Sequence, residues 1–369
     1  MLKRFEVENF KGFKETLTFD LAAREYAFNR ILTVDGIVNK AIVYGKNGIG
    51  KSCLGFAMFD IVGHLTDKER MPSHYLRNYI NLDSGHPYAR FKYFFQFDGD
   101  EIVYEYRKKD PDNLVDEKLW INGALLLDYA YADGGNRMVD RELCGDLKIE
   151  LIDNRLSVVK YIYRNTPTDF QPVFAKMMRF CEGMLWYRSL SEGNTYCGYT
   201  NGGAILTEKL YESGKLHDFE EFLKENEVPY QLKFVLNNGS HELMAVFDDG
   251  RAMAPFLSLI STGTSALLLY YVWSISSFDS ISLLFIDEFD AFFHFEAAEG
   301  IILRLNKARG FQTILTSHNT YLMQNRLTRP DCCFIMTRNG VKSLYNSTDK
   351  EIREAHNLEK MYVNGVFNE

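Results

Sequence analysis

The feature that most constrains the fold is a glycine-rich loop between a predicted strand and a predicted helix. Residues 45–52 read GKNGIGKS, which fits the pattern G-x-x-x-x-G-K-[ST], with the apolar run 41–44 before it and the helix-compatible segment 53–58 after it. Glycines let successive N–H groups turn toward one anion, and the dipole of the following helix adds positive potential there. The sequence therefore predicts a loop that binds the phosphates of a nucleoside triphosphate.

The predicted loop also assigns individual roles. Lys51 is placed to reach the β- and γ-phosphates, and Ser52 is placed to ligate Mg²⁺. The candidate residues for binding ATP are Gly45, Asn47, Gly48, Gly50, Lys51 and Ser52.

A second predicted strand supplies what hydrolysis requires. The nearly unbroken apolar run 281–286 is typical of a buried parallel strand, and it ends in Asp287 and Glu288. Nucleotide sites in open α/β sheets lie at the carboxyl ends of the strands. We expect Asp287 to hold Mg²⁺, directly or through water, and Glu288 to orient or deprotonate the attacking water.

A third strand is predicted at 312–317, where it ends in His318. The segment 296–307 between the second and third strands fits one helix, so the three elements form a βαβ unit. This unit sets His318 beside Glu288, where the imidazole is placed to sense the γ-phosphate.

With a serine-rich turn at 261–264, the order of motifs resembles the ABC-type ATPases of the SMC, RecF and OLD group. Residues 261–264 read STGT, between the apolar runs 257–260 and 265–269, and are similar to the signature motif of OLD-like ATPases. The resemblance implies that Ser261 and Gly263 of one subunit face the γ-phosphate held by another. ATP would then lie between two protomers of a homodimer or higher homo-oligomer, and a monomer would be inactive.

Two further segments refine the resemblance. Residues 1–14 are similar to the first strand and turn of these ATPases, which cover the adenine side of the site. Six residues after Glu288, where transporters and SMC proteins have aspartate, the chain has His294 within Phe-Phe-His, similar to the Leu-His-Pro of OLD-like proteins. This difference argues against the transporter branch.

About fifty residues follow His318, too few for the TOPRIM nuclease domain of OLD nucleases. The chain thus resembles stand-alone OLD-like ATPases of anti-phage defence, of the abortive-infection, Septu and PARIS types. The resemblance implies an ATPase that controls a separate effector, a nuclease or a toxin. The alternatives are a DNA-repair or DNA-binding ATPase of the RecF or SMC type, and a scaffold that binds ATP with scarcely any hydrolysis.

The expected fold class is α/β: a P-loop ABC-type ATPase domain with a mixed sheet, a β-meander and an inserted helical lobe. Meander strands are predicted at 91–97, 101–107 and 118–121, helices at 169–186 and 207–226, and a loop at 191–203. The predicted division is 1–165 for the first part of the ATPase domain, 166–230 for the lobe and 231–369 for the second part. No heptad run is present, so we expect a compact lobe and no coiled-coil arm.

One expected element of such ATPases, a glutamine that contacts Mg²⁺, has two candidates. Gln96 lies in a predicted strand and Gln171 precedes a predicted helix, and the sequence does not choose between them.

Bulk properties bear on location and partners. Six cysteines without a C-x-x-C pair, and an N-terminal segment without an apolar core, favour a cytoplasmic protein. The net charge of −8 disfavours a globally basic DNA-binding surface. DNA contact is left to two local candidates, one at 326 and 329 and the other at 107–109.

Overall fold

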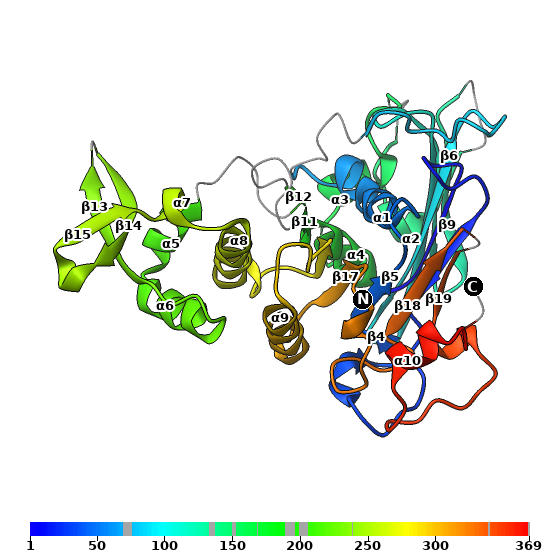
Figure 1. The fold of residues 1–369 in the computed structure, drawn as a ribbon. Helices are drawn as coiled ribbons and strands as arrows, with labels where there is room; N and C mark the ends of the chain where they lie inside the picture. The colour runs from blue at the N-terminus through cyan, green and yellow to red at the C-terminus, as the bar shows by residue number, and fades with distance from the viewer. Residues whose placement is uncertain are drawn as a thin grey trace.

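The chain forms a broad α/β body that contains both termini, and a lobe projects from one side of it (Figure 1). The computed structural model describes residues 1–68, 76–132, 137–149, 153–167, 169–188, 196–198, 206–237, 239–338 and 340–367. Within these ranges, no helix combines the length and apolar character that a membrane crossing needs.

The central sheet of the body carries the predicted motifs. Its strands are β5 (Lys40–Tyr44), β11 (Met184–Arg188), β12 (Tyr196–Gly198), β16 (Leu283–Asp287), β17 (Gln312–Ser317), β18 (Cys333–Thr337) and β19 (Gly340–Ser343). They follow the order β12-β11-β16-β17-β5-β18-β19. The five inner strands are parallel, and the two edge strands are antiparallel to their neighbours. The predicted unit of strand, helix and strand is thus confirmed, with β17 between β16 and β5.

Alternating residues of the central strands enter two separate cores, as the period of a β-strand requires. Leu283 and Phe285 of β16 belong to one core, whereas Leu284 and Ile286 belong to the other. The first core holds helices α1 (Lys51–Leu65), α3 (Val158–Asn165) and α4 (Pro172–Glu182), and the second holds α8 (Thr262–Ser277) and α9 (Phe295–Lys307). At Gly55 a Cβ atom would lie 2.8 Å from Phe285, so this glycine lets α1 approach β16 closely.

A second, antiparallel sheet encloses the first core. Its strands are β1 (Leu2–Glu8), β2 (Leu17–Asp20), β6 (Ala89–Phe97), β7 (Asp100–Lys108), β8 (Leu114–Ile121), β9 (Ala124–Ala130) and β10 (Arg137–Val139). The order β10-β9-β8-β7-β6-β1-β2 confirms the predicted meander, including the turn in which Phe97 pairs with Asp100. Smaller elements of the body are β3 (Thr33–Val34), β4 (Ile37–Val38), α2 (Arg141–Cys144) and α10 (Leu358–Val363).

The projecting lobe combines helices with a small sheet. Its elements are α5 (Leu206–Ser213), α6 (Leu216–Glu225), β13 (Gln231–Asn237), β14 (Ser240–Phe247), β15 (Ala252–Pro255) and α7 (Phe256–Leu259). The helix predicted at 207–226 is divided at Gly214, whose φ of +67° ends α5. Part of the loop predicted at 191–203 forms β12 at 196–198, and the rest of it lies outside the described residues.

The helix predicted at 169–186 ends at Glu182, and the residues after Gly183 form the buried strand β11. A Cβ atom on Gly183 would lie 2.9 Å from the backbone nitrogen of Ser282, so the chain passes close to the start of β16 here. The run 184–187 is apolar throughout and fully buried, which suits a central strand. Thus α4 and β11 pack in the body, while residues 231–237 and 239–259 lie in the projecting lobe (Figure 1).

Candidate functional site

The glycine loop lies between β5 and α1, as predicted, and its lysine is folded into it. Gly48 and Gly50 have φ values of +76° and +112°, which residues with a Cβ atom rarely adopt. Lys51 Nζ donates hydrogen bonds to the carbonyl oxygens of Gly45 (2.7 Å) and Lys46 (3.2 Å). Burial lowers the pKa of Lys51, while the charges of Asp287 and Glu288 act in the opposite direction. The ammonium group is therefore held by the loop, within electrostatic reach of Asp287 and Glu288.

The hydroxyl group of Thr316, on β17, connects the two acids that follow β16. Thr316 Oγ1 donates to Asp287 Oδ1 at 2.7 Å and accepts from the backbone N–H of Glu288 at 2.8 Å. Glu288 has a φ of +50°, an uncommon conformation for a residue with a side chain. The sheet register and this one hydroxyl thus fix both acids at the carboxyl edge of the sheet.

The surroundings of Asp287 fit a divalent cation. The side chain is fully buried, and its Oδ2 atom has no hydrogen-bond partner and lies 3.5 Å from Arg188 Nε. Burial raises the pKa of Asp287. Hydrogen bonds from the hydroxyls of Ser52 and Thr316 and the charge of Arg188 act in the opposite direction and lower this pKa. A buried carboxylate with an open oxygen is costly unless a cation or donor completes it. Ser52 and Asp287 are therefore suited to hold Mg²⁺.

The described residues contain no group of three or more His, Cys, Asp or Glu side chains arranged for a metal. Mg²⁺ is usually held in proteins by one or two carboxylates together with water and substrate phosphates.

Asp290, a residue the motifs did not single out, adds another buried acid to this edge. Ser317 Oγ donates to its Oδ2 atom at 2.8 Å, and its Oδ1 atom has no hydrogen-bond partner. Burial raises the pKa of Asp290. The hydrogen bond from Ser317 and the charges of His318 and Lys51 lower this pKa. His318 follows β17 directly and is exposed.

Arg188, at the end of β11, is another residue that the sequence motifs missed. Its guanidinium group forms a forked pair with Glu288, from Nε to Oε2 (3.1 Å) and from Nη2 to Oε1 (2.7 Å). The signal in the sequence was an arginine directly after the apolar run 184–187, most of which was assigned to the end of the helix predicted at 169–186. Arg188 pairs in register with Asp287, so both side chains end at the same edge.

Neither candidate glutamine is found in this group of interacting side chains. The backbone of Gln96 is paired with Met1 at the start of the meander sheet. Gln171 Nε2 donates to the carbonyl oxygen of Glu142, before α4. Arg188 occupies the end of the strand beside β16, and neither glutamine does.

The predicted signature forms a separate group with the segment after Glu288. Ser261 caps α8, accepting a hydrogen bond from the backbone N–H of Thr264 at 3.2 Å. A Cβ atom on Gly263 would lie 2.7 Å from the carbonyl oxygen of Phe292, so only glycine fits there.

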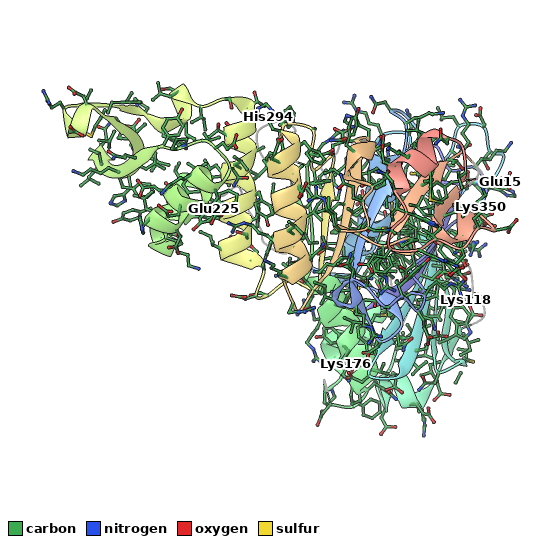
Figure 2. The ribbon with its side chains drawn as sticks, turned by 60° about the horizontal axis from the view of Figure 1, so that its bottom comes forward. Glu15, Lys118, Lys176, Glu225, His294 and Lys350 are labelled. Carbon is green, nitrogen blue, oxygen red and sulfur yellow. The ribbon has the colours of Figure 1, made fainter. Side chains whose placement is uncertain are left out.

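Ser261, Gly263 and His294 line one hollow of about 600 Å³, and Figure 2 shows His294 at the start of α9. In the described part of the chain, no hydrogen bond or ion pair joins Ser261 to Lys51, Asp287 or Glu288.

The basic residues considered for DNA contact are largely paired with acids. Lys108 is buried and lies 2.8 Å from Asp60, and Arg329 is buried and lies 2.6 Å from Asp331. Arg107 pairs with Asp116, and Arg326 pairs with Glu299. Of the two candidate clusters, Lys109 is left as an exposed cation without such a pair among the described ion pairs.

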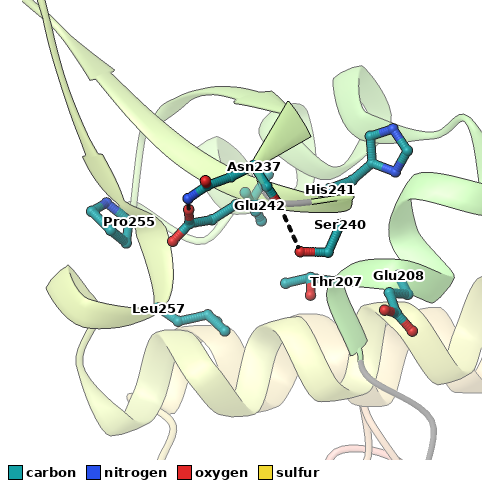
Figure 3. A pocket seen from close by; sticks show the side chains of 9 residues that line it. Thr207, Glu208, Asn237, Ser240, His241, Glu242, Pro255 and Leu257 are labelled. Carbon is teal, nitrogen blue, oxygen red and sulfur yellow. Dashed lines mark hydrogen bonds between the residues drawn. The ribbon is translucent and has the colours of Figure 1, made fainter. Parts of the chain in front are cut away.

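The lobe has a hollow of its own, of about 340 Å³, between α5 and the sheet (Figure 3). Polar side chains on one rim are tied to each other: Ser240 donates to the carbonyl oxygen of Asn237, and Asn237 donates to Glu242. Leu257, on the other rim, is 56% exposed. No acid–base or phosphate-binding group of the predicted site lies here.

Taken together, the loop between β5 and α1 and the acids after β16 lie at the carboxyl edge of a mainly parallel sheet in an α/β fold. Residues 187–324 match the family model described as "AAA domain, putative AbiEii toxin, Type IV TA system". No curated protein matches the chain.

Several solved structures are similar over nearly the whole chain. One is the SMC head bound to the C-winged helix domain of ScpA, with 14% identity, a TM-score of 0.46, and coverage of 92% of this chain and 96% of that one. The SMC head domain from Thermotoga maritima has 15% identity, a TM-score of 0.43, and coverage of 93% and 98%. The recombination mediator RecF with ATPγS has 14% identity, a TM-score of 0.39, and coverage of 93% and 98%.

Proposed function

We propose that this chain binds ATP with Mg²⁺ and hydrolyses it, and that the ATP-bound assembly controls a separate effector protein. The observation that carries the proposal is the Thr316 hydroxyl, which fixes Asp287 and Glu288 beside the lysine of a glycine loop. Phosphoryl transfer needs little more from a protein than such positioned charges and donors.

Each residue then has a distinct task. The backbone N–H groups of the loop and the Lys51 ammonium bind the phosphates, with Gly45, Asn47, Gly48 and Gly50 shaping the loop. Ser52 and Asp287 hold Mg²⁺, which when bound neutralises charge on the phosphate oxygens. Glu288 orients the attacking water and accepts its proton, and His318 contacts the γ-phosphate.

The assembly follows from the separate position of the signature. Ser261 and Gly263 line a hollow away from their own glycine loop, and the start of α8 offers N–H groups to an anion. We infer that they complete the site of a second copy, so the active unit is a homodimer or a larger homo-oligomer. The effector, a nuclease or toxin of anti-phage defence, is the proposed recipient of the signal, and the cytoplasm is the proposed location.

The test is to measure molar mass by light scattering and phosphate release, for the wild type and for Glu288→Gln, with and without ATP and Mg²⁺. We expect the wild type to hydrolyse ATP, and the variant to lose turnover by about 10²–10⁴-fold while it keeps an ATP-dependent increase in mass. Glu105→Gln, which removes an acid paired with Lys92 in the meander sheet, is the matched control and keeps turnover.

Two results contradict parts of the proposal. Rapid turnover by Glu288→Gln removes Glu288 from its role, and a monomer under all conditions removes the shared site. Tight ATP-dependent DNA binding by the purified protein alone favours the alternative, a RecF-like or SMC-like ATPase that acts directly on DNA.

A further inference from the structure

The Arg188 guanidinium occupies a position that conflicts with the role of Glu288. Its fork engages both carboxylate oxygens, at 3.1 and 2.7 Å. A carboxylate held in this way has fewer free lone pairs with which to accept a hydrogen bond from water. The contact with Arg188 therefore restrains the carboxylate to which we assign the water.

The same guanidinium also lies near the proposed Mg²⁺ ligand, with Nε 3.5 Å from Asp287 Oδ2. It is close enough to Lys51 for its charge to contribute to lowering the pKa of that lysine. Arg188 thus approaches the two acids from β11, the strand next to β16, whereas Lys51 belongs to the loop after β5, which lies on the other side of β16 beyond β17. A bound cation at Asp287 would repel Arg188, whereas the terminal phosphate of ATP would attract it.

The side chain of Arg188 is partly exposed at the edge of the sheet. It is 25% exposed, and it projects from the last residue of β11 at the edge where the phosphates bind. Arginine is suited to this exchange because its planar fork pairs with a carboxylate and with a phosphate in the same geometry.

We propose that Arg188 is a further substrate-contacting residue, which pairs with Glu288 in the nucleotide-free protein and with the γ-phosphate when ATP is bound. The exchange releases Glu288 to the water only when a third phosphate is present, so Arg188 distinguishes ATP from ADP. This inference rests on the proposed ATPase function.

The test compares dissociation constants for ATP and ADP, measured by calorimetry with Mg²⁺, in the wild type, Arg188→Ala and Arg188→Lys. We expect Arg188→Ala to weaken ATP binding about 10–100-fold, as for the loss of a charge-assisted pair, and ADP binding less than about 3-fold. Arg188→Lys restores part of the difference, because lysine keeps the charge but not the fork.

Arg90→Ala is the matched control, because Arg90 also makes a forked contact, with Glu8 on the meander sheet, and is 24% exposed. We expect it to leave both dissociation constants unchanged.

A second measurement separates contact with phosphate from support of Glu288. In the Glu288→Gln background, Arg188→Ala must still weaken ATP binding; if the effect disappears there, Arg188 only holds Glu288 and the assignment is overturned. Equal weakening of ATP and ADP overturns it too. A wild type that binds neither nucleotide overturns the proposed function and this inference together, whereas normal ATP binding by Arg188→Ala overturns the inference alone.

Discussion

Two groups of buried carboxylates lie along α1, and they differ in how fully their oxygens are used. Near the end of the helix, Asp60 accepts from Tyr106 (2.9 Å) and Tyr79 (2.7 Å) and pairs with Lys108 (2.8 Å). Beyond it, Glu117 accepts from Tyr104 and Ser157, each at 2.5 Å, and from the backbone of Val158 at 2.8 Å, with Tyr131 as a further donor. Every carboxylate oxygen in this group has a partner.

At the start of the same helix the acids are incompletely paired, since Asp287 Oδ2 and Asp290 Oδ1 have no hydrogen-bond partner. An interior built only for stability satisfies its buried polar groups. The group around Asp60 thus joins α1 to the meander sheet, while the group around Asp287 keeps two unpaired carboxylate oxygens, where we propose that a ligand binds.

The largest expected effect is on the satisfied group. Asp60→Asn leaves Lys108, which is 1% exposed, without a full counter-charge, so we expect the free energy of unfolding to fall by about 3–5 kcal/mol. Chemical denaturation measures this loss. Asp128→Asn, which breaks a partly exposed pair with Lys118, serves as the control and costs less than about 1 kcal/mol. If the two variants lost a comparable free energy of unfolding, the fully paired group around Asp60 would be no more important for stability than a surface ion pair.

The second largest expected effect concerns the Thr316 hydroxyl, which fixes Asp287 and Glu288. Thr316→Val removes the donor to Asp287 and the acceptor of the Glu288 N–H group, so we expect ATP turnover to fall about 10–100-fold. Thr313→Val is the control, because Thr313 lies on the same strand and its hydroxyl accepts from Lys40 at 3.0 Å, away from the acids. Steady-state kinetics check this; equal losses in the two variants would speak against a specific role for Thr316.

The smallest expected effect is a gain in stability, on substitution of Asp287. Burial holds the pKa of Asp287 above its value of 3.8 in the unfolded chain, so the folded protein favours the protonated acid. Stability then decreases as the pH rises from 3.8 through the folded pKa, and at neutral pH the buried charge is a cost. Without Mg²⁺ and nucleotide, we expect Asp287→Asn to gain about 0.5–2 kcal/mol at pH 7.5, and the gain to shrink toward pH 4.

Thermal unfolding at both pH values measures this gain. If Asp287→Asn instead lost stability at pH 7.5, the Asp287 carboxylate would stabilise the fold, as Asp60 and Glu117 are expected to do.

Sequence reasoning reached the parts of the molecule whose structure is decided locally. The glycine pattern, the apolar run before Asp287 and the β-rich runs of the meander each predict local elements, and these elements are present. Sequence reasoning also predicted that β17 lies beside β16, because two strands joined by one helix commonly form a parallel pair.

What it missed depends on contacts between distant segments. The run at 184–187 has no periodicity that separates a strand from a helix, and only its pairing with β16 makes it a strand. Arg188 was therefore not recognised at the site edge. Thr316 and Asp290 carry no motif, and their relevance comes from neighbours supplied by other strands. The lobe sheet at 231–255 went unrecognised as well, because that region was assigned to the ATPase domain.

The close approach at Gly55 has a consequence for observing the protein in solution. The Cβ position of that glycine lies 2.9 Å from the indole nitrogen of Trp186, so this tryptophan touches α1 and stands two residues before Arg188 on β11. The chain has three tryptophans, so replacing Trp120 and Trp273 with phenylalanine would leave one emitter. Its fluorescence would then report, without any added dye, every movement of the glycine-loop helix against the strand that bears the arginine.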